Sequence, residues 1–308
     1  MVMSTGSRVV VQVPATSANL GPGFDALGLA LDIREELHLW VLAEGGSPEI
    51  RVSGVNAGIF PEDETLLAYR SAVAVFDRIG MQAPPLGLEL VTRIPSSGGL
   101  GGSAAAIVAG VVAANALAGK PLNRAGELSL VAEIEGHPDN VSAALLGGLV
   151  VCVAGRDGLV TSRLPVESDL RAVVCLPDEA ISTKSARGVI PRDFPIGDAV
   201  FNLGRTALLV AAFANKEWGL LRDAMDDRIH QPARGGIFPA LHPTIEAALA
   251  AGAHGAALSG AGAAIIALAT GHFKEIATAM HEAAARHGYP NQTLELGLTN
   301  RGAEVITG

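Results

Sequence analysis

The order of hydrophobic and polar positions along the chain predicts a mixed fold in which strands come in groups. Residues 86–94 alternate leucine with small or polar residues, which is typical of a strand. Residues 65–79 have helical spacing, and an apolar helix is expected at 103–118, where glycine and proline follow. Further strands are expected at 8–13, 35–41, 49–52, 148–154, 172–176, 256–259 and 264–269, and further helices at 124–135, 244–251, 273–287 and through most of 198–230. Because strands do not alternate strictly with helices, the pattern favours an α+β fold over a doubly wound sheet.

The longest apolar runs are too short to predict a membrane helix. The run 104–114 stops at Asn115, the run 143–155 contains two adjacent glycines, and the run 255–269 is interrupted by Ser259. A membrane-spanning helix needs about 20 consecutive apolar residues. We therefore expect these runs to be buried helices and strands of a compact protein, and we expect no membrane partner.

Composition and charge narrow the class of protein further. The chain has 308 residues, of which 49% are hydrophobic, enough for one large domain or two modest ones. We expect an N-terminal domain at 1–155 and a C-terminal domain at 156–308. The net charge is −9 and no basic cluster is present, which argues against a nucleic-acid partner. Two cysteines in apolar runs and a short polar start without a signal peptide favour the cytoplasm.

A glycine-rich segment at 95–105, PSSGGLGGSAA, is the strongest local signal for ligand binding. Its four glycines allow a close backbone approach to a ligand, and the N-terminus of the helix that follows favours an anion. A plain helix entry, a dinucleotide fingerprint and a triphosphate loop all remain possible readings. The dinucleotide motif normally opens the first βα unit, with an acidic residue about 20 positions later, whereas position 123 is Asn. A Walker A loop is excluded, because the only Gly-Lys pair is followed by Pro121.

The pattern P-x-x-x-G-L-G-x-S-A-A in this segment resembles the second motif of the GHMP kinase superfamily. In that superfamily the loop wraps the phosphates of ATP. The usual form is G-L-G-S-S; this chain has Gly102 at the first serine, and Ser103 corresponds to the second, which resembles the Mg²⁺-side ligand. The resemblance implies that ATP and Mg²⁺ are used, and that ATP is bound by Pro95, Ser96, Ser97, Gly98, Gly99, Leu100, Gly101, Gly102, Ser103, Ala104 and Ala105.

Residues 13–31 are similar to the first motif of the homoserine kinases across its whole length. The turn at 21–23, Gly-Pro-Gly, is expected to hold Asn19 and Asp25 on one side of a rigid loop. Asp25 can accept a hydrogen bond from an ammonium group, and Asn19 can donate and accept. We therefore expect this pair to contact the amine and the hydroxyl of an amino-acid substrate.

The segment 133–140, EIEGHPDN, supplies the expected metal and catalytic residues. In the family a Glu on this helix resembles the Mg²⁺ ligand, and Glu133 is preferred over the alternative, Glu135. His137 and Asn140 match substrate contacts of the homoserine kinases. Asp139 is similar in position to the catalytic Asp of mevalonate kinase and galactokinase. Whether it acts as a base is open, because a loose phosphoryl-transfer transition state needs little base help. The catalytic candidates are Asp139, Asn140 and Ser103.

Three further segments follow in family order. Residues 181–191 resemble the homoserine kinase pattern S-T-x-x-A-R-x-x-x-P, which makes Thr183 and Arg187 substrate residues. The segment 231–234, QPAR, is similar to one whose Arg, here Arg234, also reaches substrate. We expect both arginines to hold the carboxylate at one end of the substrate, with Asp25 at the other end. Residues 255–262 are similar to the third GHMP motif, in which Ser259 is the only hydroxyl left as a substrate contact.

The resemblance implies a GHMP kinase fold, with an N-terminal domain of ribosomal-protein-S5-like type and a ferredoxin-like C-terminal domain. It also implies a homodimer and phosphorylation of the side-chain hydroxyl of L-homoserine for threonine biosynthesis. The alternatives are another GHMP kinase, of mevalonate or shikimate type, and a nucleotide-binding sensor without catalysis. The adenine pocket has no assignment, because Asp63, Glu64 and Thr65 stand where the family often has an Asn.

Overall fold

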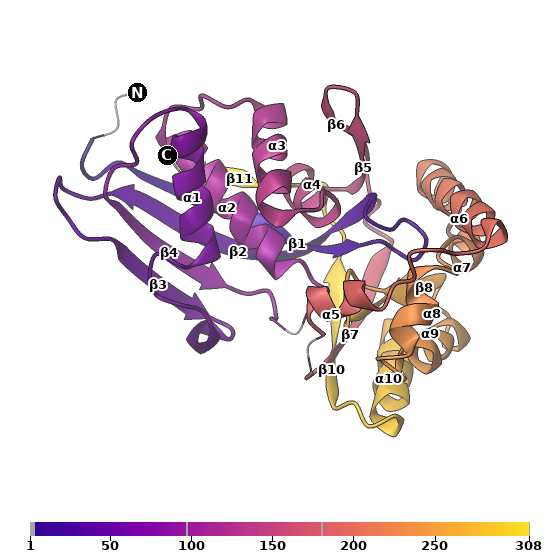
Figure 1. Cartoon of the computed structure of the whole chain (residues 1–308). Helices are drawn as coiled ribbons and strands as arrows, with labels where there is room; N and C mark the ends of the chain where they lie inside the picture. Colours follow the sequence, from indigo (N-terminus) through magenta and orange to yellow (C-terminus); the bar gives the residue numbers. More distant parts are fainter. Residues whose placement is uncertain (1–3, 97, 180, 308) are drawn as a thin grey trace.

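The computed structural model describes residues 4–96, 98–179 and 181–307, which form two sheets with helices packed on them (Figure 1). The larger sheet has the order β11-β1-β2-β4-β3, and β5 extends it by pairing with β2 and β6. All of its pairings are antiparallel except that of β3 with β4. Its strands are β1 (Arg8–Ala18), β2 (Leu27–Val41), β3 (Glu49–Gly54), β4 (Leu86–Thr92), β5 (Leu149–Gly155), β6 (Gly158–Leu164) and β11 (Glu304–Thr307).

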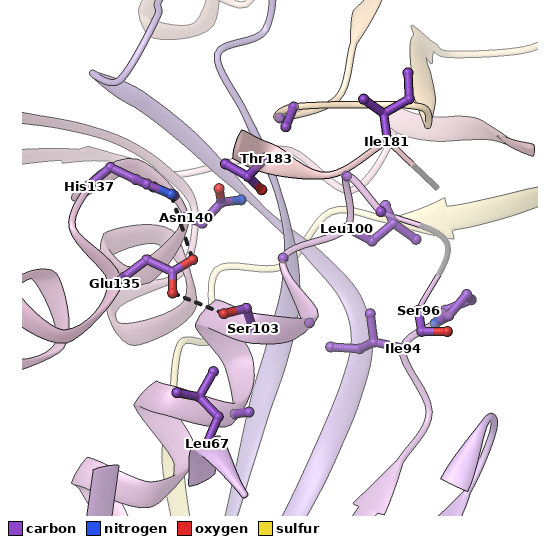
Figure 2. Close-up of a pocket in the computed structure, with 18 of the residues that line it drawn as sticks. Leu67, Ile94, Ser96, Leu100, Ser103, Glu135, His137, Asn140, Ile181 and Thr183 are labelled. Atoms are coloured by element: carbon purple, nitrogen blue, oxygen red, sulfur yellow. Dashed lines mark hydrogen bonds and ion pairs between the residues drawn. The ribbon is translucent and has the colours of Figure 1, made fainter. Parts of the chain in front are cut away.

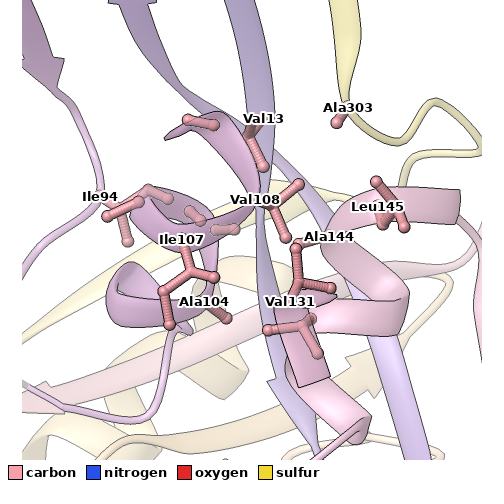
Figure 3. Packing of buried hydrophobic residues seen from close by; sticks show 14 of the residues in the cluster. Val13, Ile94, Ala104, Ile107, Val108, Val131, Ala144, Leu145 and Ala303 are labelled. Atoms are coloured by element: carbon pink, nitrogen blue, oxygen red, sulfur yellow. The ribbon is translucent and has the colours of Figure 1, made fainter. Parts of the chain in front are cut away.

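Four helices cover one side of the larger sheet: α1 (Leu67–Arg78), α2 (Gly102–Leu117), α3 (Arg124–Glu135) and α4 (Asp139–Leu146). Figure 3 shows Val108 and Ile107 of α2 packed among Val13, Val131 and Ala144 from the sheet and from neighbouring helices. Because α2 is enclosed by β1, α1, α3 and α4, it is apolar on every face rather than amphipathic. This central helix fixes the position of the glycine-rich segment that precedes it.

The smaller sheet has the order β10-β7-β9-β8 and is antiparallel throughout. Helices α9 and α10 pack on it around a second core that contains Phe238, Ile265 and Met280. Its elements are β7 (Arg171–Pro177), α9 (Leu241–Ala250), β8 (Gly255–Leu258), β9 (Ile265–Ala269), α10 (Phe273–Arg286) and β10 (Asn291–Gly297). The remaining helices are α5 (Thr183–Gly188), α6 (Ile196–Asn215), α7 (Leu221–Ala224), α8 (His230–Gly235) and the 3₁₀ turns Ala57–Ile59 and Trp218–Leu220.

In the described residues, α6 alone is long and apolar enough to cross a membrane, a feature that the apolar runs did not predict. Its most apolar window is 22% buried in the structure. One such helix is weak evidence for a membrane, because apolar helices of other proteins pass the same test.

The α+β class and most predicted elements are confirmed, but several elements were missed. These are α4, β6, α5, α8 after its first residue, β10, β11 and the 3₁₀ turn Ala57–Ile59. β2 also begins at Leu27 instead of residue 35, because its first five residues are buried on both faces and do not alternate. α4 begins at Asp139, inside a segment whose charged residues resemble a surface turn.

The change from one sheet to the other occurs later than the predicted boundary at residue 155. Residue 155 lies at the β5–β6 turn, where Gly155 pairs with Gly158. β6 belongs to the larger sheet and β7 to the smaller one, and β11 returns to pair with β1. We therefore propose residues 165–170 as the boundary, with the final strand rejoining the first domain.

The contact between α1 and α2 gives a test of this packing. A Cβ atom on Gly110 of α2 would lie 2.2 Å from the carbonyl oxygen of Ala68. We expect Gly110→Ala to destabilise the protein by about 2 kcal/mol, since overpacking a core costs about 1–3 kcal/mol. On α6, Gly204 has no neighbour within 4 Å, so Gly204→Ala should stabilise it by up to about 1 kcal/mol. Urea unfolding measures both, and equal shifts in the two variants would contradict the tight α1–α2 contact.

Candidate active site

A cavity of about 530 Å³ lies where the glycine-rich segment, the α3–α4 connection, α5, α8 and the turn at 260–262 meet (Figure 2). It contains most of the side chains singled out from the sequence. The predicted site residues that line it are Asn19, Asp25, Pro95, Ser96, Gly98, Gly99, Leu100, Gly101, Gly102, Ser103, His137, Asp139, Asn140, Thr183, Arg187 and Arg234. They lie between β1 and β2, in the glycine-rich segment and the start of α2, at the α3–α4 connection, and in α5 and α8.

The glycine-rich segment approaches its neighbours so closely that two positions require glycine. Gly101 has φ +67°, and a Cβ atom there would lie 2.0 Å from Oγ1 of Thr16. Gly99 has φ +93°, and its Cβ atom would lie 2.6 Å from the carbonyl oxygen of Ser259. Gly101 is the N-cap of α2, so the free N–H groups of the first turn lie beside the cavity. This arrangement fits an anion such as a phosphate.

Two of the predicted phosphate contacts do not line the cavity. The side chains of Ala104 and Ala105 are fully buried in the core between α2 and its neighbours, and the N–H of Ala105 donates to the carbonyl oxygen of Gly101. A contact of the Ala104 N–H with phosphate stays a prediction. Ser97 lies outside the described residues.

A connected set of polar side chains extends from Ser103 across the cavity wall (Figure 2). Ser103 Oγ donates to Glu135 Oε2 at 3.0 Å. His137 Nε2 lies 3.8 Å from Glu135 Oε1, and His137 Nδ1 lies 2.8 Å from Asp139 Oδ1. Burial raises the pKa of Glu135, and the hydrogen bond to Asp139 raises the pKa of His137. The set therefore combines a hydroxyl, two carboxyl groups and an imidazole that favours its charged form.

The preference for Glu133 as the metal ligand is corrected in favour of Glu135. Glu133 forms an ion pair with Arg78 on the outside of α3, and its side chain is 68% exposed. Two positions apart on a helix correspond to a rotation of about 200°, so Glu133 and Glu135 point in opposite directions. Glu135 lines the cavity and contacts Ser103.

The oxygen atoms of Ser103 and Glu135 fit a hard cation such as Mg²⁺, which prefers oxygen ligands and keeps several waters. No group of three or more His, Cys, Asp or Glu side chains that could hold a metal occurs within residues 4–96, 98–179 and 181–307. A cation at this site would therefore need further ligands from a bound phosphate and from water.

Asp139 and Asn140 are held rigidly at the start of α4. Asp139 is 2% exposed, and its Oδ1 accepts the backbone N–H of Asn140 at 2.8 Å. Asn140 Nδ2 donates to Oγ1 of Thr16 at 2.9 Å. The backbone N–H of Thr16 in turn donates to the carbonyl oxygen of Leu100, so α4, β1 and the phosphate segment are tied together.

At the other end of the cavity, Asp25 and Arg187 form a bidentate ion pair. Arg187 donates from NH1 and NH2 to the two oxygens of Asp25 at 2.9 and 2.6 Å, and the pKa of Arg187 is raised by this contact. The guanidinium groups of Arg187 and Arg234 lie 5.4 and 5.5 Å from the ring centroid of Phe24. The structure therefore places Asp25 and Arg187 side by side rather than at opposite ends of the cavity, and their contact with a substrate stays a prediction.

Two predicted substrate contacts instead hold the site together. Asn19 donates to the carbonyl oxygen of Gly260 at 2.9 Å and accepts the N–H of Asp25 at 3.1 Å. Ser259 is fully buried, its hydroxyl lies 2.8 Å from that of Ser17, and it hydrogen-bonds to the carbonyl oxygen of Gly99. Ser259 does not line the cavity, so its prediction as a substrate contact is corrected.

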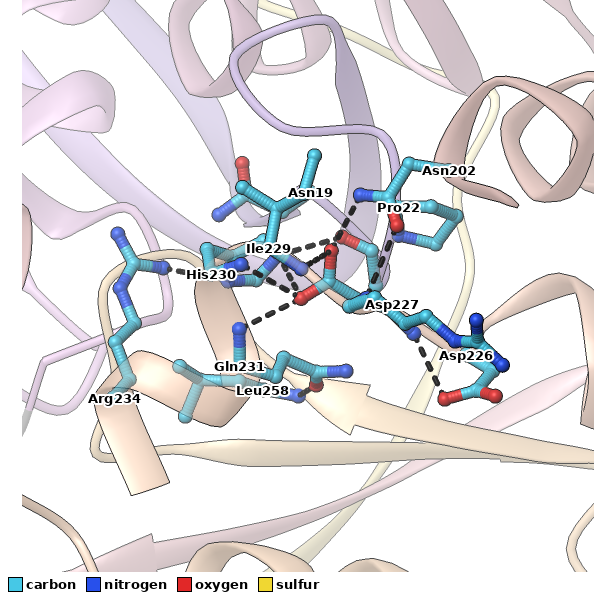
Figure 4. Close-up of polar contacts among 12 residues, drawn as sticks. Asn19, Pro22, Asn202, Asp226, Asp227, Ile229, His230, Gln231, Arg234 and Leu258 are labelled. Atoms are coloured by element: carbon cyan, nitrogen blue, oxygen red, sulfur yellow. Dashed lines mark hydrogen bonds and ion pairs between the residues drawn. The ribbon is translucent and has the colours of Figure 1, made fainter. Parts of the chain in front are cut away.

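A buried polar network behind the cavity, which the sequence did not predict, positions Arg234 (Figure 4). Asp227 accepts from the N–H groups of His230 and Gln231 at 2.9 and 2.7 Å. His230 Nε2 lies 2.6 Å from the carbonyl oxygen of Gly21, so Nε2 carries the proton and Nδ1 accepts from Arg234 at 3.2 Å. Burial lowers the pKa of His230, which is consistent with this neutral form.

An apolar compartment completes the cavity and was also missed. It adjoins the phosphate segment and is lined by Ile59, Phe60, Pro61, Leu66, Leu67, Leu90 and Ile94. Glu35 of β2 lines the same cavity. The sequence signal for this compartment is Glu35, an acidic residue at one of the alternating buried positions of β2.

Comparisons with known proteins place both parts of the chain in one family. Residues 67–148 match the family model of the GHMP kinases N terminal domain, and residues 209–286 match that of the GHMP kinases C terminal domain. A homoserine kinase of Moorella thermoacetica is 42% identical over 297 residues, which cover 96% of this chain and 99% of that protein. The crystal structure of homoserine kinase from Cytophaga hutchinsonii has a TM-score of 0.87 at 32% identity and covers 99% of both chains. A mevalonate kinase of L. major has a TM-score of 0.70 at 17% identity, covering 94% and 96%, a likeness of fold alone.

The contact between His137 and Asp139 can be tested by titration. We expect Asp139→Asn to lower the pKa of His137, because the amide removes the negative charge that favours the imidazolium. NMR titration of the imidazole protons measures the shift. His254, which hydrogen-bonds to Thr270 on the smaller sheet, is the internal control and should not change. An unchanged midpoint for His137 would show that the ion pair does not form in solution.

Proposed function

The chain belongs to the GHMP kinase family, and we propose that it transfers the γ-phosphoryl group of ATP to the side-chain hydroxyl of L-homoserine. The product would be O-phospho-L-homoserine, an intermediate of threonine biosynthesis. The similarity to homoserine kinases over nearly the whole chain supports this activity. The observation that carries the proposal is that one cavity joins the N-terminus of α2 to the ion pair of Asp25 and Arg187.

The ion pair suits an α-amino acid because the two charges of the zwitterion are attached to one carbon atom. A site for such a molecule needs an acceptor and a donor next to each other, as Asp25 and Arg187 are. Arg187 uses two of its five N–H groups on Asp25 and keeps the others for a carboxylate. We propose that Asp25 binds the ammonium group and that Arg187 and Arg234 bind the carboxylate.

The triphosphate of ATP would lie on the glycine-rich segment, with its base in the apolar compartment. The N–H groups at the start of α2 would bind phosphate oxygens. Ser103 and Glu135 would hold Mg²⁺, which supplies charge stabilisation for the transferring phosphoryl group. His137, Asn140 and Thr183 line the cavity between these parts and would orient the hydroxyl of homoserine.

Asp139 has two possible roles in this arrangement. Its Oδ1 is already occupied by His137 and by the N–H of Asn140, which favours a positioning role over proton abstraction. A loose transition state gains most from alignment of the reacting groups, so positioning is sufficient for the reaction.

We further propose that the protein is cytoplasmic, forms a homodimer and acts on small molecules rather than on nucleic acid. The family resemblance supports the dimer. The net charge of −9 and the lack of a basic cluster in the sequence support small molecules, rather than nucleic acid, as partners.

The metal assignment predicts different results for two neighbouring carboxylates. We expect Glu135→Gln to lower kcat by at least ~10²-fold and to raise the Mg²⁺ concentration needed for half-maximal rate, because a charged ligand is lost. Glu133→Gln removes the same charge from the opposite face of α3 and should leave both quantities near wild type. Steady-state kinetics at varied Mg²⁺ measure both. If Glu133→Gln is inactive and Glu135→Gln is active, the metal ligand is Glu133 and not Glu135.

The substrate assignment predicts which acceptors are phosphorylated. ADP release should depend on L-homoserine and should not occur with mevalonate or without an acceptor. 4-Hydroxybutyrate, which lacks the amine, should be a poor acceptor for the wild type. Asp25→Asn should raise the KM for homoserine by roughly 30-fold, since loss of a charge contact that the bound substrate buries costs about 2 kcal/mol or more, and should leave the KM for ATP nearly unchanged. Equal rates with both acceptors would exclude recognition of an amino acid.

A further inference from the structure

Glu35 occupies a position that the pattern of β2 reserves for a buried apolar residue. It shares the core face of the strand with Leu37, Leu39 and Val41, and it is 2% exposed. Its Oε2 is fully buried without a hydrogen-bond partner, and neither of its oxygens is hydrogen-bonded within the part of the chain that the structure describes. A carboxyl group in this state is costly to bury, and a ligand that bonds to it would recover part of the cost.

The cavity around Glu35 is the part suited to a nucleotide base. Leu90 on β4 lies opposite Leu37, the next core-facing residue of β2 after Glu35. Leu66 and Leu67 come from the start of α1, and Ile94 immediately precedes the phosphate segment. A nucleotide with its phosphates at the start of α2 would therefore have its base in the compartment that contains Glu35. This step rests on the proposed function.

The surroundings of Glu35 keep it uncharged near neutral pH. Burial alone raises its pKa to about 8. Its strand neighbours are engaged elsewhere, Arg34 with the carbonyl oxygens of Arg301 and Gly302, and Glu36 with Gln12 and His38. The charged side chains of the cavity come from other elements and do not contribute to the shift: Asp25, Glu135, His137, Asp139, Arg187 and Arg234. A bound triphosphate adds negative charge and would favour the same neutral form.

We propose that the carboxyl group of Glu35 binds the 6-amino group of adenine and an adjacent ring nitrogen, and so selects ATP over the triphosphate of purine riboside, whose base has no substituent at position 6. A neutral carboxyl group has one O–H donor and one carbonyl acceptor. Adenine presents the matching pair, an amino donor next to a ring-nitrogen acceptor, on both sides of its amino group. Guanine loses the match on its N7 side but has a complementary pair, O6 and N1–H, on the other side, so the comparison that tests this contact is with unsubstituted purine.

Two substitutions separate this role from a purely structural one. Gln at this position has a donor and an acceptor and carries no charge at any pH, so Glu35→Gln should retain ATP affinity. Leu matches the neighbouring core positions and has no polar atom, so Glu35→Leu should bind ATP roughly tenfold more weakly or worse. It should also lose the preference of the wild type for ATP over the triphosphate of purine riboside. Titration calorimetry of the whole protein measures each affinity without turnover.

The pH dependence of ATP binding gives a second measurement. Above about pH 7.5 a triphosphate is fully ionised, so its own protons do not contribute. Because the neutral carboxyl group binds, the ATP affinity of the wild type should fall as pH rises through about 8. The affinity of Glu35→Gln should not change over this range, because its amide does not titrate.

The outcomes distinguish this inference from the proposed function. Glu35→Leu removes a buried carboxyl group without a hydrogen-bond partner, so urea unfolding should show the variant to be at least as stable as the wild type. Weaker ATP binding by this variant would then reflect the lost contact and not a loss of folded protein. If Glu35→Leu keeps the wild-type affinity and base preference while the wild type phosphorylates homoserine, the role of Glu35 is overturned and the kinase proposal stands. If the wild type does not bind ATP, both are overturned.

Discussion

The site depends on the close approach of three backbone segments that are far apart in the sequence: the end of β1, the glycine-rich segment and the turn at 259–262. The N–H of Gly260 donates to the carbonyl oxygen of Ala18, and Ser259 bonds to that of Gly99. The N–H of Thr16 donates to the carbonyl oxygen of Leu100. Two of these contacts join main chain to main chain, and a Cβ atom on Gly99 would lie 2.6 Å from the carbonyl oxygen of Ser259, so a larger side chain does not fit there. The contacts set the distance between the phosphate end and the amino-acid end of the cavity.

Two pairs of charged side chains line the cavity: Asp25 with Arg187, and Glu135 with His137. Asp25 and Arg187 lie next to each other and match the two adjacent charges of an amino acid. Glu135 and His137 belong to a connected set in which each group changes the pKa of another. Arg234 is 2% exposed and owes its direction to His230, which is itself fixed by Gly21. The direction of Arg234 at the cavity therefore depends on side chains that lie behind it.

The sequence predicted the parts of the fold that have a local signal. The alternation at residues 86–94 and the apolar run after the glycines each define one element, and both are confirmed. The motifs also identified most of the residues that line the cavity. The sequence could not show which way each side chain points. Only the packing of α3 against its neighbours places Glu135 at the cavity and Glu133 on the outside. Likewise, the adjacency of Asp25 and Arg187 and the burial of Ser259 arise from contacts between residues more than 150 positions apart.

The pairing of β11 with β1 means that the order of synthesis and the order of assembly differ. Residues 304–307 complete the edge of the larger sheet, yet the ribosome produces them after every strand of the smaller sheet. Until then, the outer edge of β1 has unpaired N–H and C=O groups, the kind of edge that pairs with other chains. A nascent chain thus holds a nearly finished first domain with one open edge while the second domain forms, and the interval of greatest exposure to misassembly falls late in translation.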